Sequence, residues 1–108
     1  MEILEYLDAE GRSPYLDWFD GLNAVAAAKI TVAITRMRLG NLSNAKGVGS
    51  GVQEYRIDFG PGYRIYFGRD GEMLVILLAG GTKKRQQADI ATAQARWADY
   101  KRRKKGAG

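Results

Sequence analysis

The sequence predicts a small α+β domain with two helices near the N-terminus, a mainly antiparallel sheet and a C-terminal helix. Three observations support this prediction. Apolar residues recur at helical spacing over residues 24–39, apolar and polar residues alternate over residues 53–67, and an apolar run covers residues 73–79. A length of 108 residues suits one domain, which we expect to span residues 1–104, with residues 105–108 as a disordered tail.

The first half of the chain predicts a helical hairpin behind a short leading segment. Residues 2–7 fit either an edge strand or the start of a helix. Ser13 and Pro14 are typical of an N-cap and a first helical position. The apolar side of this first helix comprises Leu16, Trp18, Phe19 and Leu22.

A second helix follows over residues 24–39, between Asn23 as its N-cap and Gly40 as its C-terminal stop. Its apolar stripe comprises Leu22, Val25, Ala26, Ile30, Ala33, Ile34 and Met37. Residues 41–51 have the composition of a loop.

The second half predicts three strands and a helix. Residues 53–59 and 63–68 alternate around a Gly-Pro-Gly turn and predict a β-hairpin. Residues 73–79 are continuously apolar, which favours a central strand covered on both faces, ended by two glycines at 80 and 81. Residues 86–104 predict the last helix. The predicted order is therefore β-α-α-β-β-β-α.

Composition limits the chemistry that the chain can perform. It contains no Cys and no His, which excludes disulfides and removes the commonest general base and metal ligand. No apolar stretch is long enough to cross a bilayer, so we expect a cytoplasmic protein. The net charge is +5, and residues 46–85 hold seven basic against four acidic residues. This distribution indicates an anionic partner such as nucleic acid, although solvated surface charge accounts for it equally well.

The hairpin carries the candidate chemistry, because alternate side chains of a strand share a face. Tyr, Ile and Phe residues occupy one predicted face. The other face would display Glu54, Arg56, Asp58, Arg64 and Tyr66. Arginines bind phosphate oxygens and a tyrosine ring stacks on an unpaired base, so this face predicts an RNA platform. The alternative is an ordinary solvated face with cross-strand ion pairs, in which Asp58 has a purely structural role. The arginines beside these carboxylates argue against a metal site.

A second basic group follows the predicted central strand. Lys83 and Lys84 come directly after two glycines and before a helix, where a phosphate can approach the backbone closely. A solvated basic turn, capped by Thr82, is the alternative. Lys46 and Arg85, in the same basic stretch of the chain, are further candidates for RNA binding.

Most of the chain also resembles a known family. The segments EYRIDFGPGYRIYF, LLAGGTKK and the terminal RWADYK helix, in this order and spacing, resemble the phage-derived, HigB-type branch of the RelE/ParE toxin superfamily. The resemblance covers residues 13–103 and implies the RelE-like fold, two N-terminal helices packed on a mainly antiparallel sheet. It also implies the toxin of a type II toxin–antitoxin module, which cuts mRNA on the ribosome without a metal or other cofactor.

The resemblance implies a role for each candidate residue. Arg56 and Arg64 match the strand arginines that hold the scissile phosphate, and Lys83 and Lys84 match the basic segment after the last strand. Glu54 stands where a general base is expected, although a lysine with a lowered pKa is an alternative base. The implied partners are mRNA, the ribosome and a cognate antitoxin with a helix-turn-helix domain, and no membrane.

Two other functions remain open from the sequence. The ParE branch of the superfamily poisons gyrase, so the chain could be a gyrase-directed toxin or a catalytically inactive binding module. A basic nucleic-acid-binding domain that acts through residues 101–105 is the third hypothesis.

Overall fold

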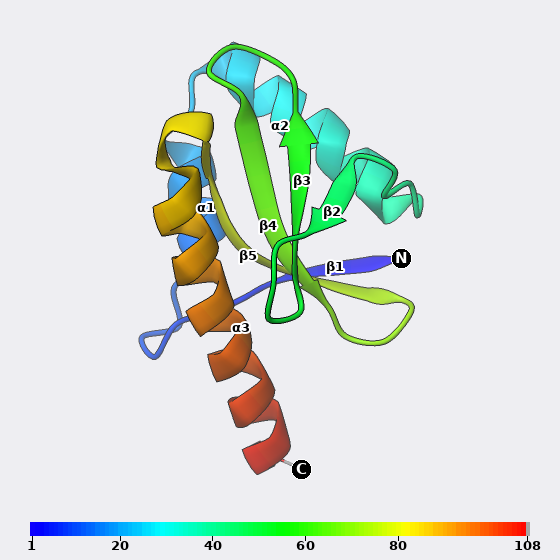
Figure 1. The fold of residues 1–108 in the computed structure, drawn as a ribbon, viewed down its shortest axis with the longest axis vertical. Helices are drawn as coiled ribbons and strands as arrows, with labels where there is room; N and C mark the ends of the chain where they lie inside the picture. The colour runs from blue at the N-terminus through cyan, green and yellow to red at the C-terminus, as the bar shows by residue number, and fades with distance from the viewer. Residues whose placement is uncertain (108) are drawn as a thin grey trace.

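The computed structural model describes residues 1–107, which form three α-helices and a five-stranded mixed sheet (Figure 1). The predicted α+β class is confirmed. In chain order the elements are β1 (Glu2–Glu5), α1 (Pro14–Asp20), α2 (Ala24–Arg38), β2 (Ala45–Gly47), β3 (Val52–Ile57), β4 (Tyr63–Arg69), β5 (Leu74–Thr82), a 3-10 turn (Lys83–Arg85) and α3 (Gln86–Ala107).

The predicted caps begin and end the first two helices. The side chains of Ser13 and Asn23 each accept a hydrogen bond from the backbone N–H three residues later, at 3.0 and 2.9 Å. At the end of α2, Gly40 has a φ of +88°. The N–H groups of Gly40 and Asn41 return to the carbonyls of Met37 and Arg36, which is a Schellman motif.

The strands lie in the order β1-β5-β4-β3-β2. β1 runs parallel to β5, and the other neighbours are antiparallel. The open choice for residues 2–7 is thereby settled as a strand. The central position predicted for the apolar run is also confirmed, because β5 lies between β1 and β4 and is buried over residues 75–79.

Several boundaries differ from the prediction. β3 ends at Ile57 and not at residue 59, so Asp58 lies in the loop between β3 and β4. β2 lies inside the predicted loop 41–51. It was not predicted because it is held by backbone pairing with β3 and has no alternating side-chain pattern. β5 continues past its predicted end to Thr82, since Gly80 and Gly81 still pair with β4. α3 continues through residues 105–107, part of the expected tail, and Gly108 lies outside the described residues.

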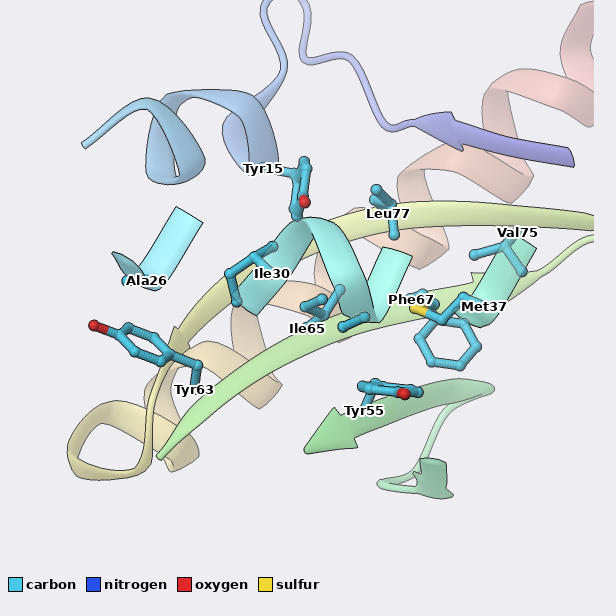
Figure 2. Packing of buried hydrophobic residues seen from close by; sticks show 11 residues of the cluster. Tyr15, Ala26, Ile30, Met37, Tyr55, Tyr63, Ile65, Phe67, Val75 and Leu77 are labelled. Atoms are coloured by element: carbon cyan, nitrogen blue, oxygen red, sulfur yellow. The ribbon is translucent and has the colours of Figure 1, made fainter. Parts of the chain in front are cut away.

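One core lies between the sheet and the first two helices. Figure 2 shows the labelled side chains of α1 and α2, such as Ile30 and Met37, facing those of the sheet, such as Ile65 and Phe67. Two expected members of the helical stripes are outside this core, because Leu16 and Val25 are exposed, and Tyr15 is buried instead of Leu16. The apolar face predicted for the hairpin is therefore the face that α1 and α2 cover.

A second core lies on the opposite face of the sheet, beneath α3 (Figure 1). Ala93 and Trp97 of α3 pack against Tyr66, Ile76 and Leu78. The basic end of α3 is also attached to the rest of the domain, since Lys104 Nζ lies 2.6 Å from the Asp70 carboxylate. Of the described helices, none is long and apolar enough to cross a membrane.

Candidate functional site

The β3–β4 pair places the two candidate arginines directly opposite each other. Arg56 is the register partner of Arg64, and Glu54 is the partner of Tyr66. Opposite residues of an antiparallel pair share a face, so all four side chains lie on the α3 face of the sheet. The register therefore brings four of the five predicted residues to one face, whereas Asp58 lies beyond the end of β3, and α3 covers part of that face.

Tyr66 is the residue that this covering affects most. Its side chain is fully buried in the core beneath α3, so the expectation that its ring is displayed for base stacking is wrong. Burial and the nearby charge of Glu54 raise the pKa of the phenol. The hydroxyl is buried near Glu54 but outside hydrogen-bonding geometry to any described group.

Glu54 is also fully buried, and both of its carboxylate oxygens accept hydrogen bonds. Oε1 accepts from Arg56 Nε at 3.0 Å, and Oε2 accepts from the Gln86 side chain at 2.9 Å. Burial alone would raise the pKa of Glu54. The hydrogen bonds from Arg56 and Gln86, together with the charge of Arg64, outweigh burial and hold this pKa below its ordinary value. Glu54 is therefore an ionised anchor for the arginines and is poorly suited to accept a proton from a substrate.

The two arginines differ in exposure. The Arg64 side chain is buried; its Nη1 donates to the Gly62 carbonyl at 2.7 Å and its Nε lies 3.8 Å from Glu54 Oε1. The Arg56 side chain is about half exposed. Both guanidinium groups thus lie beside the same buried carboxylate. Arg56 is hydrogen-bonded to it, whereas Arg64 is hydrogen-bonded to the Gly62 carbonyl and interacts with Glu54 through its charge.

The arginines meet a lysine at a surface pocket of about 340 Å³, which we call the phosphate pocket. It is lined by Arg56, Ile57, Asp58, Gly62, Arg64 and Lys83. Lys83 is held there because its backbone N–H donates to the Gly62 carbonyl at 2.9 Å, which joins the 3-10 turn to the β3–β4 loop. Three cations and one exposed carboxylate therefore line one hollow.

The remaining predicted site residues lie elsewhere. Lys84 is exposed on the 3-10 turn and does not line the phosphate pocket. Lys46 is exposed on the edge strand β2, opposite Glu54 in register. Arg85 lines a different pocket, beside α1 and α3.

A second hollow adjoins the phosphate pocket and contains cations that the sequence prediction did not select. This groove, of about 340 Å³, runs between α2 and β3 and shares Arg56, Ile57 and Asp58 with the phosphate pocket. Lys29 and Arg36 of α2 line it. In the sequence, Lys29 and Arg36 lie between the apolar positions of α2, but only the packing of α2 on β3 brings them near the hairpin. The hydrogen bond from Gln86 to Glu54 could not be predicted from a local sequence pattern, because the two residues are 32 positions apart.

Comparison with known proteins assigns the chain to a family. Residues 17–98 match the family described as phage-derived protein Gp49-like, and this match covers every strand of the hairpin and most of α3. The chain belongs to the Gp49-like family. An uncharacterized protein of Haemophilus influenzae is 45% identical to this Gp49-like chain over 78 residues, which are 71% of the chain and 79% of the relative.

The Gp49-like match contains all the residues of the phosphate pocket. Within the described residues, no three acidic side chains gather closely enough to hold a metal ion. The charged lining of this pocket consists of two guanidinium groups, one ammonium group and one carboxylate.

Proposed function

We propose that this Gp49-like chain is the toxin of a toxin–antitoxin pair and cleaves mRNA, as a HigB-type member of the RelE/ParE superfamily. The Gp49-like family is associated with the toxins of such pairs. The observation that carries the proposal is the convergence of Arg56, Arg64 and Lys83 on one surface pocket. Guanidinium forks are suited to the two free oxygens of a phosphodiester.

In the proposed reaction, the 2′-oxygen of the RNA attacks the adjacent phosphorus. The new O2′–P bond forms as the P–O5′ bond breaks, which leaves a 2′,3′-cyclic phosphate and a free 5′-hydroxyl. Arg56 and Arg64 stabilise the negative charge that builds up on the phosphoryl oxygens. Because Glu54 holds the Arg56 guanidinium and the Gly62 carbonyl holds that of Arg64, the site needs little rearrangement as that charge develops.

In this scheme, the exposed groups of the pocket carry out the proton transfers. Asp58 is the exposed carboxylate in the lining, so we assign it the removal of the 2′-hydroxyl proton. Lys83 faces the same hollow and supplies a proton to the departing 5′-oxygen. Glu54, first considered as the base, becomes a positioning residue in this scheme because its oxygens already bind Arg56 and Gln86.

The proposal is tested by inducing the protein and mapping transcript ends by primer extension. The wild type is expected to stop growth and to produce new 5′ ends. Arg64→Ala and Arg56→Ala are each expected to lower cleavage by about 10²–10³-fold, the usual loss for one charge-stabilising donor. Arg69→Ala is the matched control, since Arg69 is exposed at the far end of the same strand and lines neither hollow.

Because Arg64 is buried, Arg64→Ala could unfold the domain, so its folding is checked by circular dichroism. Arg56 is half exposed, and Arg56→Ala therefore tests the loss of cleavage independently of folding. Intact transcripts in cells arrested by the wild type would contradict the nuclease. They would favour the non-nucleolytic alternative, a gyrase-directed toxin or an inactive binding module.

The partners in this proposal are mRNA on the ribosome and an antitoxin with a helix-turn-helix domain. The cations of the phosphate pocket are suited to an acidic antitoxin segment that would cover the site. Co-expression of the neighbouring open reading frame is expected to restore growth. Failure of any adjacent gene product to do so would contradict this part of the proposal.

A further inference from the structure

Helix α2 is apolar on two opposite sides. One side packs into the core through the buried residues Ala26, Ile30, Ala33 and Met37. The other side faces solvent and has a second row of apolar or weakly polar residues, which we call the outer stripe: Val25, Ala28, Val32, Thr35 and Leu39. A surface helix of a single domain is normally apolar on its core side only, so the outer stripe needs a separate explanation.

The spacing of the outer stripe is that of a seam between packed helices. Its members follow one another at intervals of three, four, three and four residues, which is the spacing by which one helix packs along another. The three largest side chains are well exposed, at 60% for Val25, 48% for Val32 and 80% for Leu39. Scattered exposed apolar residues are ordinary, whereas these are aligned on one helix face. At 1.5 Å per residue, the stripe is about 20 Å long.

The two remaining members do not interrupt this seam. Ala28 is small and allows close approach of another helix. The Thr35 hydroxyl donates to the Thr31 carbonyl, one turn earlier, at 3.0 Å. This hydroxyl therefore needs no partner from outside the helix, and its neighbouring methyl group is available for packing.

Only positive charges flank the outer stripe. Lys29 and Arg36 lie on the side of α2 that faces β3, and Arg38 lies on the side that faces α1. α2 itself contains no acidic residue. If two copies of the chain packed through their stripes, these cations would meet one another, which disfavours such a dimer. A helix with an apolar seam and acidic flanking residues complements both the stripe and its charges.

A helix on the outer stripe would also compete with RNA. Val32 belongs both to the stripe and to the lining of the groove between α2 and β3, together with Lys29 and Arg36. That groove shares Arg56 with the phosphate pocket. Acidic side chains paired with Lys29 and Arg36 would withdraw these two cations from the phosphates of a bound RNA.

We propose that the outer stripe of α2 is the docking surface for an amphipathic partner helix with acidic flanking residues. The inference rests on the proposed toxin function, in which this helix is a segment of the antitoxin. Docking inhibits the toxin because the partner helix and the RNA need the same cations beside α2.

The first test compares two double variants for binding to the product of the neighbouring open reading frame, by isothermal titration calorimetry. Val25→Gln with Leu39→Gln, the stripe variant, alters the stripe outside the groove and the phosphate pocket. It is expected to bind the partner at least about tenfold more weakly, because two apolar side chains lose their burial in the complex. The control, Leu4→Gln with Leu7→Gln, replaces two exposed apolar side chains on and after β1 and should keep the wild-type affinity.

The second test concerns charge and competition. Arg38→Gln should weaken the complex but leave the affinity for RNA unchanged, since Arg38 does not line the groove. RNA affinity is measured by fluorescence anisotropy with a 2′-O-methyl RNA that cannot be cut. The partner is expected to displace this RNA from the wild type. The same amount of partner should leave the RNA bound to the stripe variant.

Equal affinity of the partner for wild type and stripe variant would overturn the proposal, as would the absence of binding to the products of both neighbouring genes. Self-association of the wild type that the stripe variant abolishes in sedimentation would also overturn it, because the stripe would then serve a second copy. So would a partner whose required segment, mapped by truncation, contains no acidic residue. Failure of the nuclease looks different: transcripts would stay intact, while the partner would still bind the wild type more tightly than the stripe variant.

Discussion

At the scale of single residues, the site depends on a buried carboxylate that two arginines share. Glu54 touches Arg56, Arg64 and Gln86, and the hydrogen bonds it accepts keep it ionised despite burial. Removing one partner of a buried ion pair leaves the other charge uncompensated. Glu54 therefore links the stability of the domain to the geometry of the phosphate pocket.

Glu54→Gln is expected to lower the free energy of unfolding by about 3 kcal/mol at neutral pH, since Arg64 would stay buried without its counter-charge. RNA cleavage should fall with it, because Arg56 would lose the charged hydrogen bond that holds its guanidinium and Arg64 would lose its counter-charge. Urea denaturation and primer extension measure the two effects. Rescue of cleavage by Glu54→Asp, but not by Glu54→Gln, would support a positioning role.

The lowered pKa of Glu54 also makes the stability of the domain depend on pH. The folded pKa of Glu54 lies below the ordinary value of 4.5, so the unfolded chain binds more protons between the two values. The stabilisation from Glu54 is complete above pH 4.5 and is lost as the pH falls through the folded pKa. The difference in unfolding free energy between wild type and Glu54→Gln should therefore shrink in acid. An unchanged difference would contradict the ion-pair interpretation.

At the scale of elements, the position of α3 decides which polar groups of the sheet reach solvent. α3 packs on β4 through Trp97, whose indole ring lies against the backbone at Gly68. Tyr66 is buried beneath this helix, while Arg56, further along the sheet, stays half exposed. The helix thus leaves open the end of the sheet where the phosphate pocket forms.

Gly68→Ala tests this packing, because a Cβ at Gly68 would lie 2.4 Å from the Trp97 ring. We expect a loss of about 1–3 kcal/mol in the free energy of unfolding, which is typical of overpacking. Gly47→Ala on β2 is the control, since nothing lies within 4 Å of its Cβ position. Equal stability of the two variants in urea would contradict the close approach of α3 to β4.

At the scale of the whole molecule, basic side chains line two adjoining hollows. The groove between α2 and β3 adds Lys29 and Arg36 to the phosphate pocket, with which it shares Arg56. By contrast, the basic end of α3 partly serves the fold, since Lys104 pairs with Asp70 and Arg103 donates to the Leu7 carbonyl. A strand of RNA is therefore expected to follow the groove rather than the end of α3.

Replacing both Lys29 and Arg36 by Gln should weaken binding of single-stranded RNA and flatten its salt dependence. Each lost phosphate contact lowers the slope of log affinity against log salt by about 0.7, so the pair should lower it by about 1.4. The control replaces Arg38 and Arg69 by Gln, which removes the same charge outside the groove. An equal change of slope in both double variants would contradict binding in the groove, because RNA affinity would then depend only on the net charge of the protein.

The sequence by itself determined the three helices, the β3–β4 hairpin, the central strand β5 and the shared face of the candidate residues, but it left β1 open and missed β2. The caps at Ser13 and Asn23 begin helices, and the alternation along the hairpin puts Glu54, Arg56 and Arg64 on one side, because these are properties of neighbouring residues.

Only the tertiary structure decided which of these side chains are accessible and what they bind. It buried Tyr66 and Glu54 beneath α3 and carried Lys83 to Gly62. Each of these contacts joins residues from different elements. Their geometry follows from how the helices pack on the sheet, and no local sequence pattern encodes that packing.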